Sequence, residues 1–263
     1  MNLNPVYIFF IIYITAIIIE AAYDHYHQKG LYDVRDTMVN LLLGALGVLL
    51  RVVTKGSWIA LWVFLYQFAP FKIQESIWSW ILLFFCNEFI YYWFHRLSHQ
   101  NRWLWAVHVN HHSSEKMNFS NAARVPFLNV ALHNLFWIPL LFIGFNPMMI
   151  FTVETIGFLF AFFQHTQLIG RLPVFEWIFN SPSHHRVHHA SNPEYMNRNY
   201  GNVLIIFDRL FGTFKNEDRK INIKFGLQKN IASYNLFTVI FHEWTVIFRK
   251  RNAETTNVLN AKS

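Results

Sequence analysis

The chain has 263 residues, of which 54% are hydrophobic, 19% aromatic and only 14% charged. Soluble domains carry roughly 25% charged residues, so this composition excludes a disordered chain and points to a membrane protein. A single cysteine, Cys86, excludes a disulfide framework and any cysteine-based zinc or iron–sulfur site. No GxGxxG motif and no Walker A lysine loop is present, so nothing suggests a bound nucleotide.

The net charge is +7, and it is unevenly distributed, because residues 171–263 hold 13 of the 22 lysines and arginines. A basic region of this kind can bind nucleic acid, but the rest of the chain is too apolar for a soluble nucleic-acid-binding protein. We therefore expect no nucleic-acid partner, and a basic cytoplasmic region beside anionic lipid.

Apolar stretches follow one another along the chain, and each is long enough for a helix. A bilayer core of ~30 Å needs ~20 apolar residues, and the backbone groups inside it must be paired. The runs are at or below this length, which leaves a re-entrant or interfacial placement open for some of them, so we expect an all-α protein with four to six membrane helices. The first stretch lacks a basic leader, which favours a retained anchor over a signal peptide. The stretches are 5–19, two short runs within 37–70 that are divided at Arg51 and Lys55, 77–94, 127–143 and 147–163.

The basic residues predict the orientation of these helices. If residues 95–126, everything after 164 and a turn at 51–55 are cytoplasmic, 19 of the 22 basic residues lie on that side, as the positive-inside rule requires. Residues 127–163 then form a hairpin that dips into the membrane, with its tip at the sequence GFNP. Residues 95–126 and 164–230 form a cytoplasmic helical cap. The amphipathic segment 233–248 either lies on the membrane surface or packs on that cap.

Histidine is unusually frequent, and ten of the fourteen histidines fall in two short stretches on either side of the hairpin. Eight of them fall into one HxxxH group and two HxxHH groups, in which residues three and four apart share a helix face. The first stretch contributes His95, His99, His108, His111 and His112, and the second contributes His165, His184, His185, His188 and His189.

Neutral imidazole is a good ligand for iron, zinc, copper and nickel. Ten histidines are too many for one ion with three or four ligands, and acidic residues are scarce in both stretches, so the pattern favours a histidine-rich site for two metals. His184 neighbours His185 but points about 100° away on a helix, which leaves its role open between ligand and support. The other histidines, His25, His27, His133 and His242, are expected to be structural.

Other polar residues are candidates for orienting the ligands, because a metal-bound histidine usually donates its second N–H to a carboxylate or carbonyl. Glu88 lies in the run 77–94, where an acid is either functional or paired. Arg186 lies among the histidines and either binds a phosphate head group or extends to the membrane surface. The remaining candidates are Asn110, Glu115, Asn118, Asn199 and Asp208.

Four sequence stretches resemble the integral-membrane fatty acid hydroxylase and sterol desaturase superfamily, and most closely its alkylglycerol monooxygenase-like branch. They are YYWFHRLSH, HVNHHSSEKMN, FNSPSHHRVHH and NYGNVLIIFDRLFGTF. The resemblance covers roughly 80–215 and implies a hydroxylase-like core in 81–215. No internal repeat and no Gly/Ser- or Pro-rich linker is visible, so we expect a single membrane-embedded domain over 1–263, with membrane helices in 1–80 and a basic tail in 216–263.

The resemblance also implies an enzyme, an O2-dependent oxidoreductase with two non-haem irons that hydroxylates or desaturates a C–H bond of a membrane lipid. Fatty acyl chains, sterols and ether lipids are the candidate substrates. It implies catalytic roles for His95, His99, His108, His111, His112, His185, His188 and His189, with His165 as a further ligand.

The same resemblance sets expectations for cofactors, partners and location. Sequences of this branch carry glutamate directly after the first motif, where this chain has Gln100, and this departure argues against the pterin that the branch otherwise implies. Electrons must come from a separate reductase, ferredoxin or cytochrome. The protein is expected to be a multi-pass protein of the inner membrane in a bacterium, or of the endoplasmic reticulum in a eukaryote. The alternative function is a membrane metal transporter with a histidine-lined site.

Overall fold

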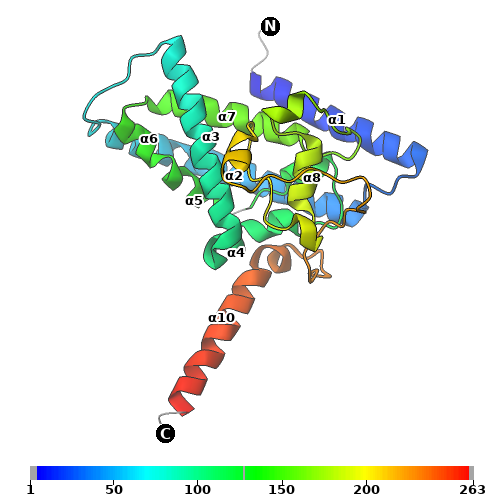
Figure 1. The fold of residues 1–263 in the computed structure, drawn as a ribbon. Coiled ribbons are helices and arrows are strands. Elements are labelled where there is room, and N and C mark those ends of the chain that lie inside the picture. Colours follow the sequence, from blue (N-terminus) through cyan, green and yellow to red (C-terminus); the bar gives the residue numbers. More distant parts are fainter. Residues whose placement is uncertain (1–4, 127, 261–263) are drawn as a thin grey trace.

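The structure is a computed structural model that describes residues 5–126 and 128–260. Helices are the only extended regular structure among these residues, and the two β-bridges, Phe179–Leu204 and Ala190–Phe225, are isolated. The expectation of an all-α protein is therefore confirmed. Figure 1 shows the helices gathered into one body, from which only the last helix projects.

Three helices are long and apolar enough to cross a membrane: α1 (Pro5–His27), α2 (Val34–Tyr66) and α3 (Ile77–Gln100). Local signals explain where the latter two begin. The Asp33 side chain accepts a hydrogen bond from the Asp36 amide at the start of α2. Ser76 and Ser79 form a reciprocal capping box at the start of α3, which satisfies amides that have no partner within the helix.

The expected division of the second apolar region at Arg51 and Lys55 is wrong, because α2 runs without interruption through both residues. Arginine and lysine are good helix formers, and no proline occurs between residues 34 and 66 to end the helix. The guanidinium of Arg51 lies 5.2 Å from the centre of the Phe158 ring, a cation–π contact that helps to accommodate its charge. Arg51 and Lys55 therefore mark no cytoplasmic turn.

Residues 128–163 form the predicted hairpin. One arm consists of α5 (Asn129–Phe136) and α6 (Ile138–Ile143), and the other is α7 (Pro147–Phe163). At the tip, Gly144 has a φ of +106°, a left-handed conformation that suits glycine, and the Asn146 side chain caps α7. Both arms are shorter than a full span. Against the expected four to six membrane helices, the described residues thus contain three helices long enough to cross a membrane and these two shorter apolar arms.

A hydrophobic core joins the hairpin to α2 and α3. Its fully buried members include Trp62 from α2, Leu83 from α3, and Trp137 and Phe145 from the hairpin. The indole N–H of Trp137 donates to the Asn87 side chain at 2.7 Å, so this polar pair is satisfied inside the apolar region. The core fixes the end of α3, and with it the first two histidines.

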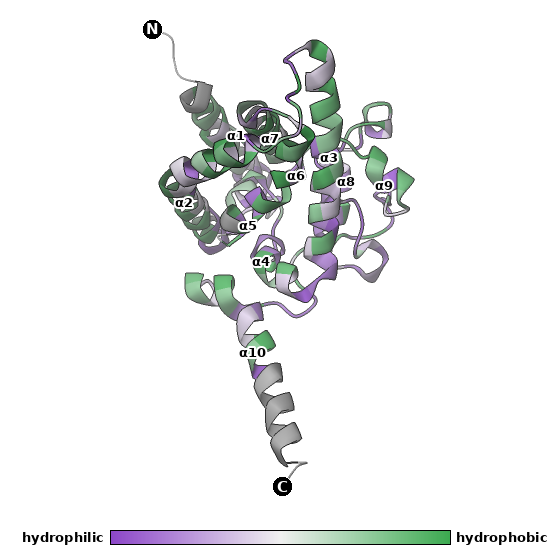
Figure 2. Ribbon diagram, turned by 90° about the vertical axis from the view of Figure 1, so that its left-hand side faces the viewer, coloured by the Kyte–Doolittle hydropathy of each residue, from purple (hydrophilic) through white to green (hydrophobic). Residues whose placement is uncertain are grey.

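The cap consists of short helices joined by irregular segments, and Figure 2 shows hydrophilic residues concentrated there and around it. The helix α10 follows the cap. Its Val239 packs on Val39 and Leu43 of α2, and the ring centres of its Trp244 and of Trp103 in α4 lie 5.9 Å apart. Of the two placements expected for this segment, the start of α10 thus adopts packing on the protein. Residues 1–4 and 261–263, which the expected domain limits include, lie outside the described residues. The elements are α4 (Arg102–His112), η1 (Phe119–Ala123), η2 (Phe175–Trp177), α8 (Pro182–His189), η3 (Pro193–Tyr195), α9 (Ile206–Leu210) and α10 (Leu236–Asn260).

Candidate metal centre

The first five histidines come from two helices that follow each other directly. His95 and His99 lie one turn apart at the end of α3. Asn101 then has an extended backbone, with φ of −96° and ψ of 125°, and its side chain accepts hydrogen bonds from the first amides of α4. This single-residue corner turns the chain back, so that α4 brings His108, His111 and His112 against the end of α3.

The remaining histidines come from α8 and from the end of the hairpin. Ser181 caps α8, and Pro182 occupies its first position, where the missing N–H is not needed. The helix is buried along its whole length, although five of its eight residues are histidine or arginine, which implies that a specific polar partner compensates for their burial. His165 follows α7 by two residues and reaches the same region.

Nine of the ten predicted histidines gather into two clusters, in each of which the ligand nitrogens lie within 4.8 Å of one another. The clusters touch, because the rings of His112 and His189 stack with their centres 4.3 Å apart. The five-histidine cluster contains His95, His99, His108, His112 and His188, and the four-histidine cluster contains His111, His165, His185 and His189.

The spacing of the Nε2 atoms fits the coordination of metal ions. Two nitrogens that each lie about 2.1 Å from one ion are ~3.0 to 3.4 Å apart, for angles between octahedral and tetrahedral. The observed Nε2–Nε2 distances are 3.2 Å for His95–His108, 3.1 Å for His108–His112, 3.4 Å for His111–His165, 3.0 Å for His165–His185 and 3.1 Å for His185–His189.

Backbone carbonyls fix which ring nitrogen carries the proton in four of these histidines. A carbonyl oxygen only accepts hydrogen bonds, so a facing Nδ1 must carry the hydrogen, and Nε2 is left with a lone pair. The pairs are His95 with Tyr200 O at 2.8 Å, His111 with Arg124 O at 3.2 Å, His165 with Ala161 O at 2.8 Å, and His188 with Arg198 O at 2.9 Å.

This assignment makes two lone pairs face each other between His111 and His165, where neutral rings cannot form a hydrogen bond. In the five-histidine cluster, Nε2 of His99 and Nε2 of His188 are buried without any partner. One cation in each cluster would satisfy these atoms. The donor set therefore fits bound metal.

Protons cannot easily take the place of such a cation. Burial lowers the pKa of His111, His112 and His185 well below the ordinary value, and the neighbouring histidines lower each of them further. Burial likewise lowers the pKa of His165 to about 4. The rings therefore stay neutral at physiological pH, which is the form that binds a metal.

His184 belongs to neither cluster. It lies on the other side of α8, fully buried, with Nε2 3.8 Å from a carboxylate oxygen of Glu176. Burial raises the pKa of Glu176, but hydrogen bonds from Ser183, the Leu172 amide and Ser181 outweigh this and hold the pKa below its ordinary value. The His184 carbonyl accepts a hydrogen bond from Asn199. His184 thus contacts the groups that support α8, and its role as a ligand stays a prediction.

A loop at residues 197–201 supplies two of the four orienting carbonyls, those of Arg198 and Tyr200. Asn197 and Asn199 have φ values of +58° and +55°, a left-handed conformation that asparagine tolerates better than most residues. The Asp208 carboxylate holds this loop, because it accepts hydrogen bonds from the Tyr200 and Gly201 amides, both at 2.7 Å. The sequence pointed to Asn199 and Asp208 but not to Tyr200, whose carbonyl faces His95. The asparagines at 197 and 199, which tolerate a left-handed backbone, were the available signal for a loop at this place.

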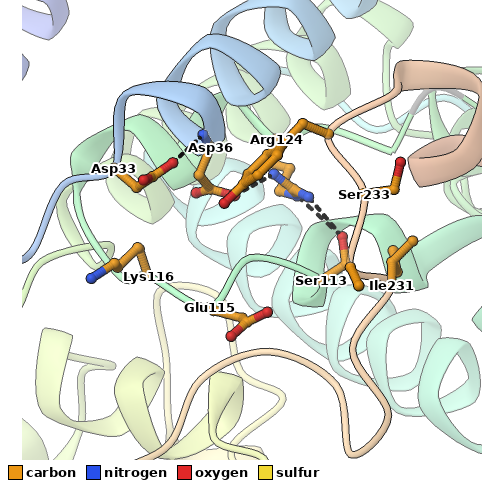
Figure 3. A pocket seen from close by; sticks show the side chains of 10 residues that line it. Asp33, Asp36, Ser113, Glu115, Lys116, Arg124, Ile231 and Ser233 are labelled. Carbon is orange, nitrogen blue, oxygen red and sulfur yellow. Dashed lines mark hydrogen bonds and ion pairs between the residues drawn. The ribbon is translucent and has the colours of Figure 1, made fainter.

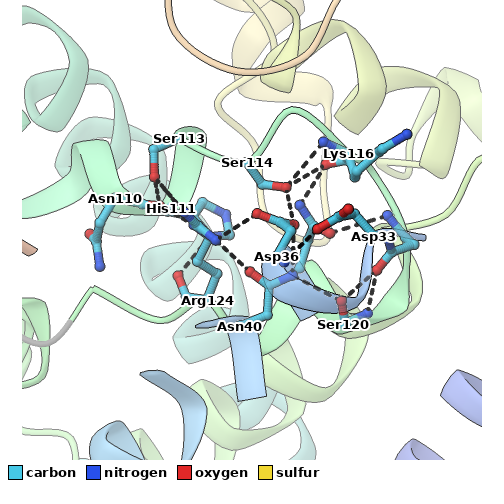
Figure 4. Close-up of polar contacts among 12 residues, drawn as sticks. Asp33, Asp36, Asn40, Asn110, His111, Ser113, Ser114, Lys116, Ser120 and Arg124 are labelled. Atoms are coloured by element: carbon cyan, nitrogen blue, oxygen red, sulfur yellow. Dashed lines mark hydrogen bonds and ion pairs between the residues drawn. The ribbon is translucent and has the colours of Figure 1, made fainter. Parts of the chain in front are cut away.

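Arg124 supports the four-histidine cluster through His111. Its carbonyl faces His111, and its buried guanidinium donates to Asp36 at 3.1 Å and to the Asn110 carbonyl at 2.7 Å, as Figure 4 shows. Ser113, which follows the last histidine of α4, accepts from the same guanidinium at 2.9 Å. The network ties α2, α4 and the segment before the hairpin into one unit.

Next to this network is a polar cavity of about 270 Å³, drawn in Figure 3. Glu115 lines it together with Asp33 and Lys116, and the chain at residues 231–234 closes one side. Glu115 therefore lines a cavity and makes no hydrogen bond to a histidine. Asn118 caps η1, and so contributes to local structure.

The two remaining charged candidates also have partners within the protein. One oxygen of Glu88 accepts hydrogen bonds from the Val203 and Leu204 amides, both at 2.8 Å, which fastens the segment after the loop to α3. Arg186 pairs with Glu217 at 2.6 Å and donates to carbonyls of the 166–169 segment. Both side chains hold the cap together.

An all-helical membrane base that carries two buried histidine clusters defines a membrane protein with a site able to hold metal. Comparison with protein families identifies the class: residues 80–213 match the model of the fatty acid hydroxylase family. The chain belongs to this family, as the four sequence motifs predicted.

Several characterised proteins are similar to the chain. Alkylglycerol monooxygenase of Xenopus tropicalis is 35% identical over 91% of this chain and 53% of its own length. The Homo sapiens protein of that name is 39% identical over 66% of this chain and 39% of its own length. Ornithine lipid hydroxylase OlsE of Rhizobium tropici is 32% identical over 55% of this chain and 44% of its own length. The chain thus spans about half the length of these relatives, and no solved structure matches it.

Proposed function

We propose that the protein is an O2-dependent lipid monooxygenase with two non-haem irons, which hydroxylates an unactivated C–H bond of a membrane lipid. The observation that carries this proposal is the pair of touching histidine clusters, in each of which the ligand nitrogens converge to within 4.8 Å of one another. The names of the relatives, a monooxygenase and a hydroxylase of lipids, support the reaction type.

The five-histidine cluster would hold one iron and the four-histidine cluster the other. Iron held there would supply the redox chemistry for O2 activation. In the overall reaction, one oxygen atom of O2 would be inserted into the C–H bond, and the other would leave as water after uptake of two electrons and two protons. Zinc would fit some of these ligands but has no redox chemistry. The nine side chains of the two clusters are all histidines, so each ion would be held by imidazole nitrogens.

The residues of this chain provide position and a dry environment for that chemistry. The carbonyls of Arg198, Tyr200, Arg124 and Ala161 fix the rings and direct Nε2 inward. Burial of the cap histidines keeps water away and keeps the rings neutral. A site of this kind spends no energy on reorganising its ligands during turnover.

The substrate class is a membrane lipid with an acyl or alkyl chain, because the clusters lie at the ends of membrane helices and the relatives act on alkylglycerol or ornithine lipid by name. Desaturation of the same chain is the variant reaction. Electrons would come from a separate reductase, ferredoxin or cytochrome. Gln100, which directly follows the first motif, argues against the pterin of the alkylglycerol branch. The membrane is the inner membrane in a bacterium or the endoplasmic reticulum in a eukaryote.

A metal transporter is the weaker alternative. A transporter places its ligands along a pathway at broken helices near the bilayer midplane. Here the ligands form two closed groups at helix ends, and α8, which supplies three of them, is buried along its whole length. This arrangement favours retention of the ions over their passage.

The test is a comparison of lipids from cells that express the protein, its His188→Ala variant or its His242→Ala variant. His188 has a bare Nε2 in the five-histidine cluster, whereas His242 lies in α10 outside both clusters. We expect lipids that have gained one oxygen atom, or lost two hydrogen atoms, with the unchanged protein and the His242 variant only. Identical lipids in all three cultures, at equal expression and with an electron donor present, would contradict the proposal.

A further inference from the structure

A patch of large apolar side chains is exposed on the cap, away from the three long helices in sequence. Val174 is 88% exposed, Trp177 70% and Ile178 52%, and Leu210 of α9 is 71% exposed. Polar residues would be expected at these positions if the cap were surrounded by water. We call the segment 168–178 together with α9 the apolar patch.

Hydrogen bonds to α3 set the depth of the apolar patch. Glu88 holds the Val203 and Leu204 amides, and the Ile205 amide in turn donates to the Ile178 carbonyl at 2.9 Å. Glu88 precedes His95 by seven residues, so it lies about 10 Å further along α3 toward the apolar end. The apolar patch is therefore fastened to α3 within its apolar run, on the membrane side of the histidine clusters.

Aromatic contacts make the apolar patch continuous with the apolar surface of the membrane helices. Phe89 of α3 is 43% exposed and lies 5.7 Å, between ring centres, from Phe207 of α9. Phe175 stacks beside Phe160 of α7 at 6.5 Å. Figure 2 shows α9 beside α3, both with hydrophobic residues. A bilayer that surrounds the exposed face of α3 at this level also meets α9.

The charges of the apolar patch suit the surface of an anionic membrane. Its two acids are buried, Glu176 at 3% exposure and Asp208 at 0%, whereas Arg171 and Arg209 are exposed. The guanidinium of Arg209 lies over the Trp177 ring at 5.4 Å. Tryptophan beside arginine is the usual composition of a membrane–water interface, where the ring sits among head groups and the cation meets phosphate.

We propose that the apolar patch inserts into the lipid bilayer, so that the cap is partly embedded beside α3 and does not stand free in water. The partner is the head-group and upper acyl layer of a membrane that contains anionic lipid. Continuity with α3 and the exposed cations argue for lipid over a protein partner. The inference does not depend on the proposed reaction, because it concerns only where the bilayer touches the protein.

The test is fluorescence of single cysteines labelled with an environment-sensitive dye, in a Cys86→Ser background. Val174→Cys reports on the apolar patch, Leu82→Cys on the exposed apolar face of α3, and Lys220→Cys on the exposed, polar part of the cap. The full chain is placed in vesicles of phosphatidylcholine and phosphatidylglycerol. Quenching is measured with doxyl groups on the acyl chains and with iodide in water. All three positions are exposed, so the substitutions disturb no packing.

We expect the dye at Val174 to behave like the dye at Leu82, with blue-shifted emission, quenching by doxyl lipid and little quenching by iodide. The dye at Lys220 should show the opposite pattern. Iodide quenching at Val174 equal to that at Lys220 would overturn the proposal. Protection at Val174 from both quenchers would also overturn it, because a protein surface, such as a second copy of this chain, would then cover the apolar patch.

Discussion

Replacement of Asp208 by asparagine tests how the 197–201 loop supports the five-histidine cluster. Asp208 Oδ1 accepts hydrogen bonds from the Tyr200 amide and from the Thr213 hydroxyl at 2.6 Å, and Oδ2 accepts from the Gly201 amide. Burial raises the pKa of Asp208 to about 6, so the group is ionised at neutral pH. Asparagine keeps the shape but places an NH2 group where one acceptor oxygen stood.

The magnitude follows from this geometry. If the amide oxygen keeps the two bonds of Oδ1, its NH2 group faces the Gly201 N–H, and that buried donor loses its partner. An unsatisfied buried donor and the loss of charge from the other bonds together cost ~2 to 4 kcal/mol of unfolding free energy. The loop carries the Tyr200 carbonyl that orients His95 at 2.8 Å. Loss of an orienting contact typically costs about 10- to 100-fold in metal affinity.

The assay is iron retention against a competing chelator, together with the thermal midpoint, for Asp208→Asn and for the control Asp218→Asn. Asp218 is exposed, and its side chain accepts one bond from the nearby Lys220 amide, so its replacement should change stability by less than about 0.5 kcal/mol. If Asp208→Asn lowered the thermal midpoint but left the iron affinity unchanged, the proposed support of His95 by Asp208 through the Tyr200 carbonyl would be refuted.

The remaining predictions concern the ligands and pH. His188→Ala and His111→Ala, one from each cluster, should each lower the bound iron and abolish turnover, whereas His242→Ala should keep its iron and its turnover. Metal analysis and lipid product assays measure these effects. Unchanged iron in both cluster variants would refute the ligand assignment. His184→Ala should cause a partial loss of turnover with most iron retained, and complete loss of one ion would show that it is a ligand. Because burial lowers the pKa of His165 and of the other cap ligands, protons compete weakly, so iron should be retained as pH falls through 6.5, the ordinary histidine value. Iron release with a midpoint at or above that value would contradict this.

Sequence spacing predicted much of the candidate site, because three or four residues make one helical turn and so place HxxxH and HxxHH on one face. It could not sort the histidines into two clusters. Neighbours in one motif separate, with His111 in one cluster and His112 in the other, since each points to a different side of α4. That division depends on how α3, α4 and α8 pack, and periodicity within one helix carries no such information.

The membrane helices show the same limit. The hairpin was predictable, because glycine, asparagine and proline at GFNP favour a tight turn before a new helix. The single long helix α2 was not predicted, because Arg51 and Lys55 suggested a break in the membrane helix, although neither residue interrupts helical hydrogen bonding. The carbonyls of Arg198 and Tyr200 that orient the histidines could not be predicted either, because every residue has a backbone oxygen and the sequence does not show where it points.

The most direct test of the central claim is the metal content and iron-edge X-ray absorption of the purified protein, expressed with sufficient iron. The account predicts two irons per chain without haem absorbance, and nitrogen ligands at about 2.1 Å as their main neighbours. His111→Ala and His188→Ala should each lower the iron count, whereas His242→Ala should not. Zinc in place of iron, a single ion per chain, or an iron count that neither cluster variant changes would contradict it.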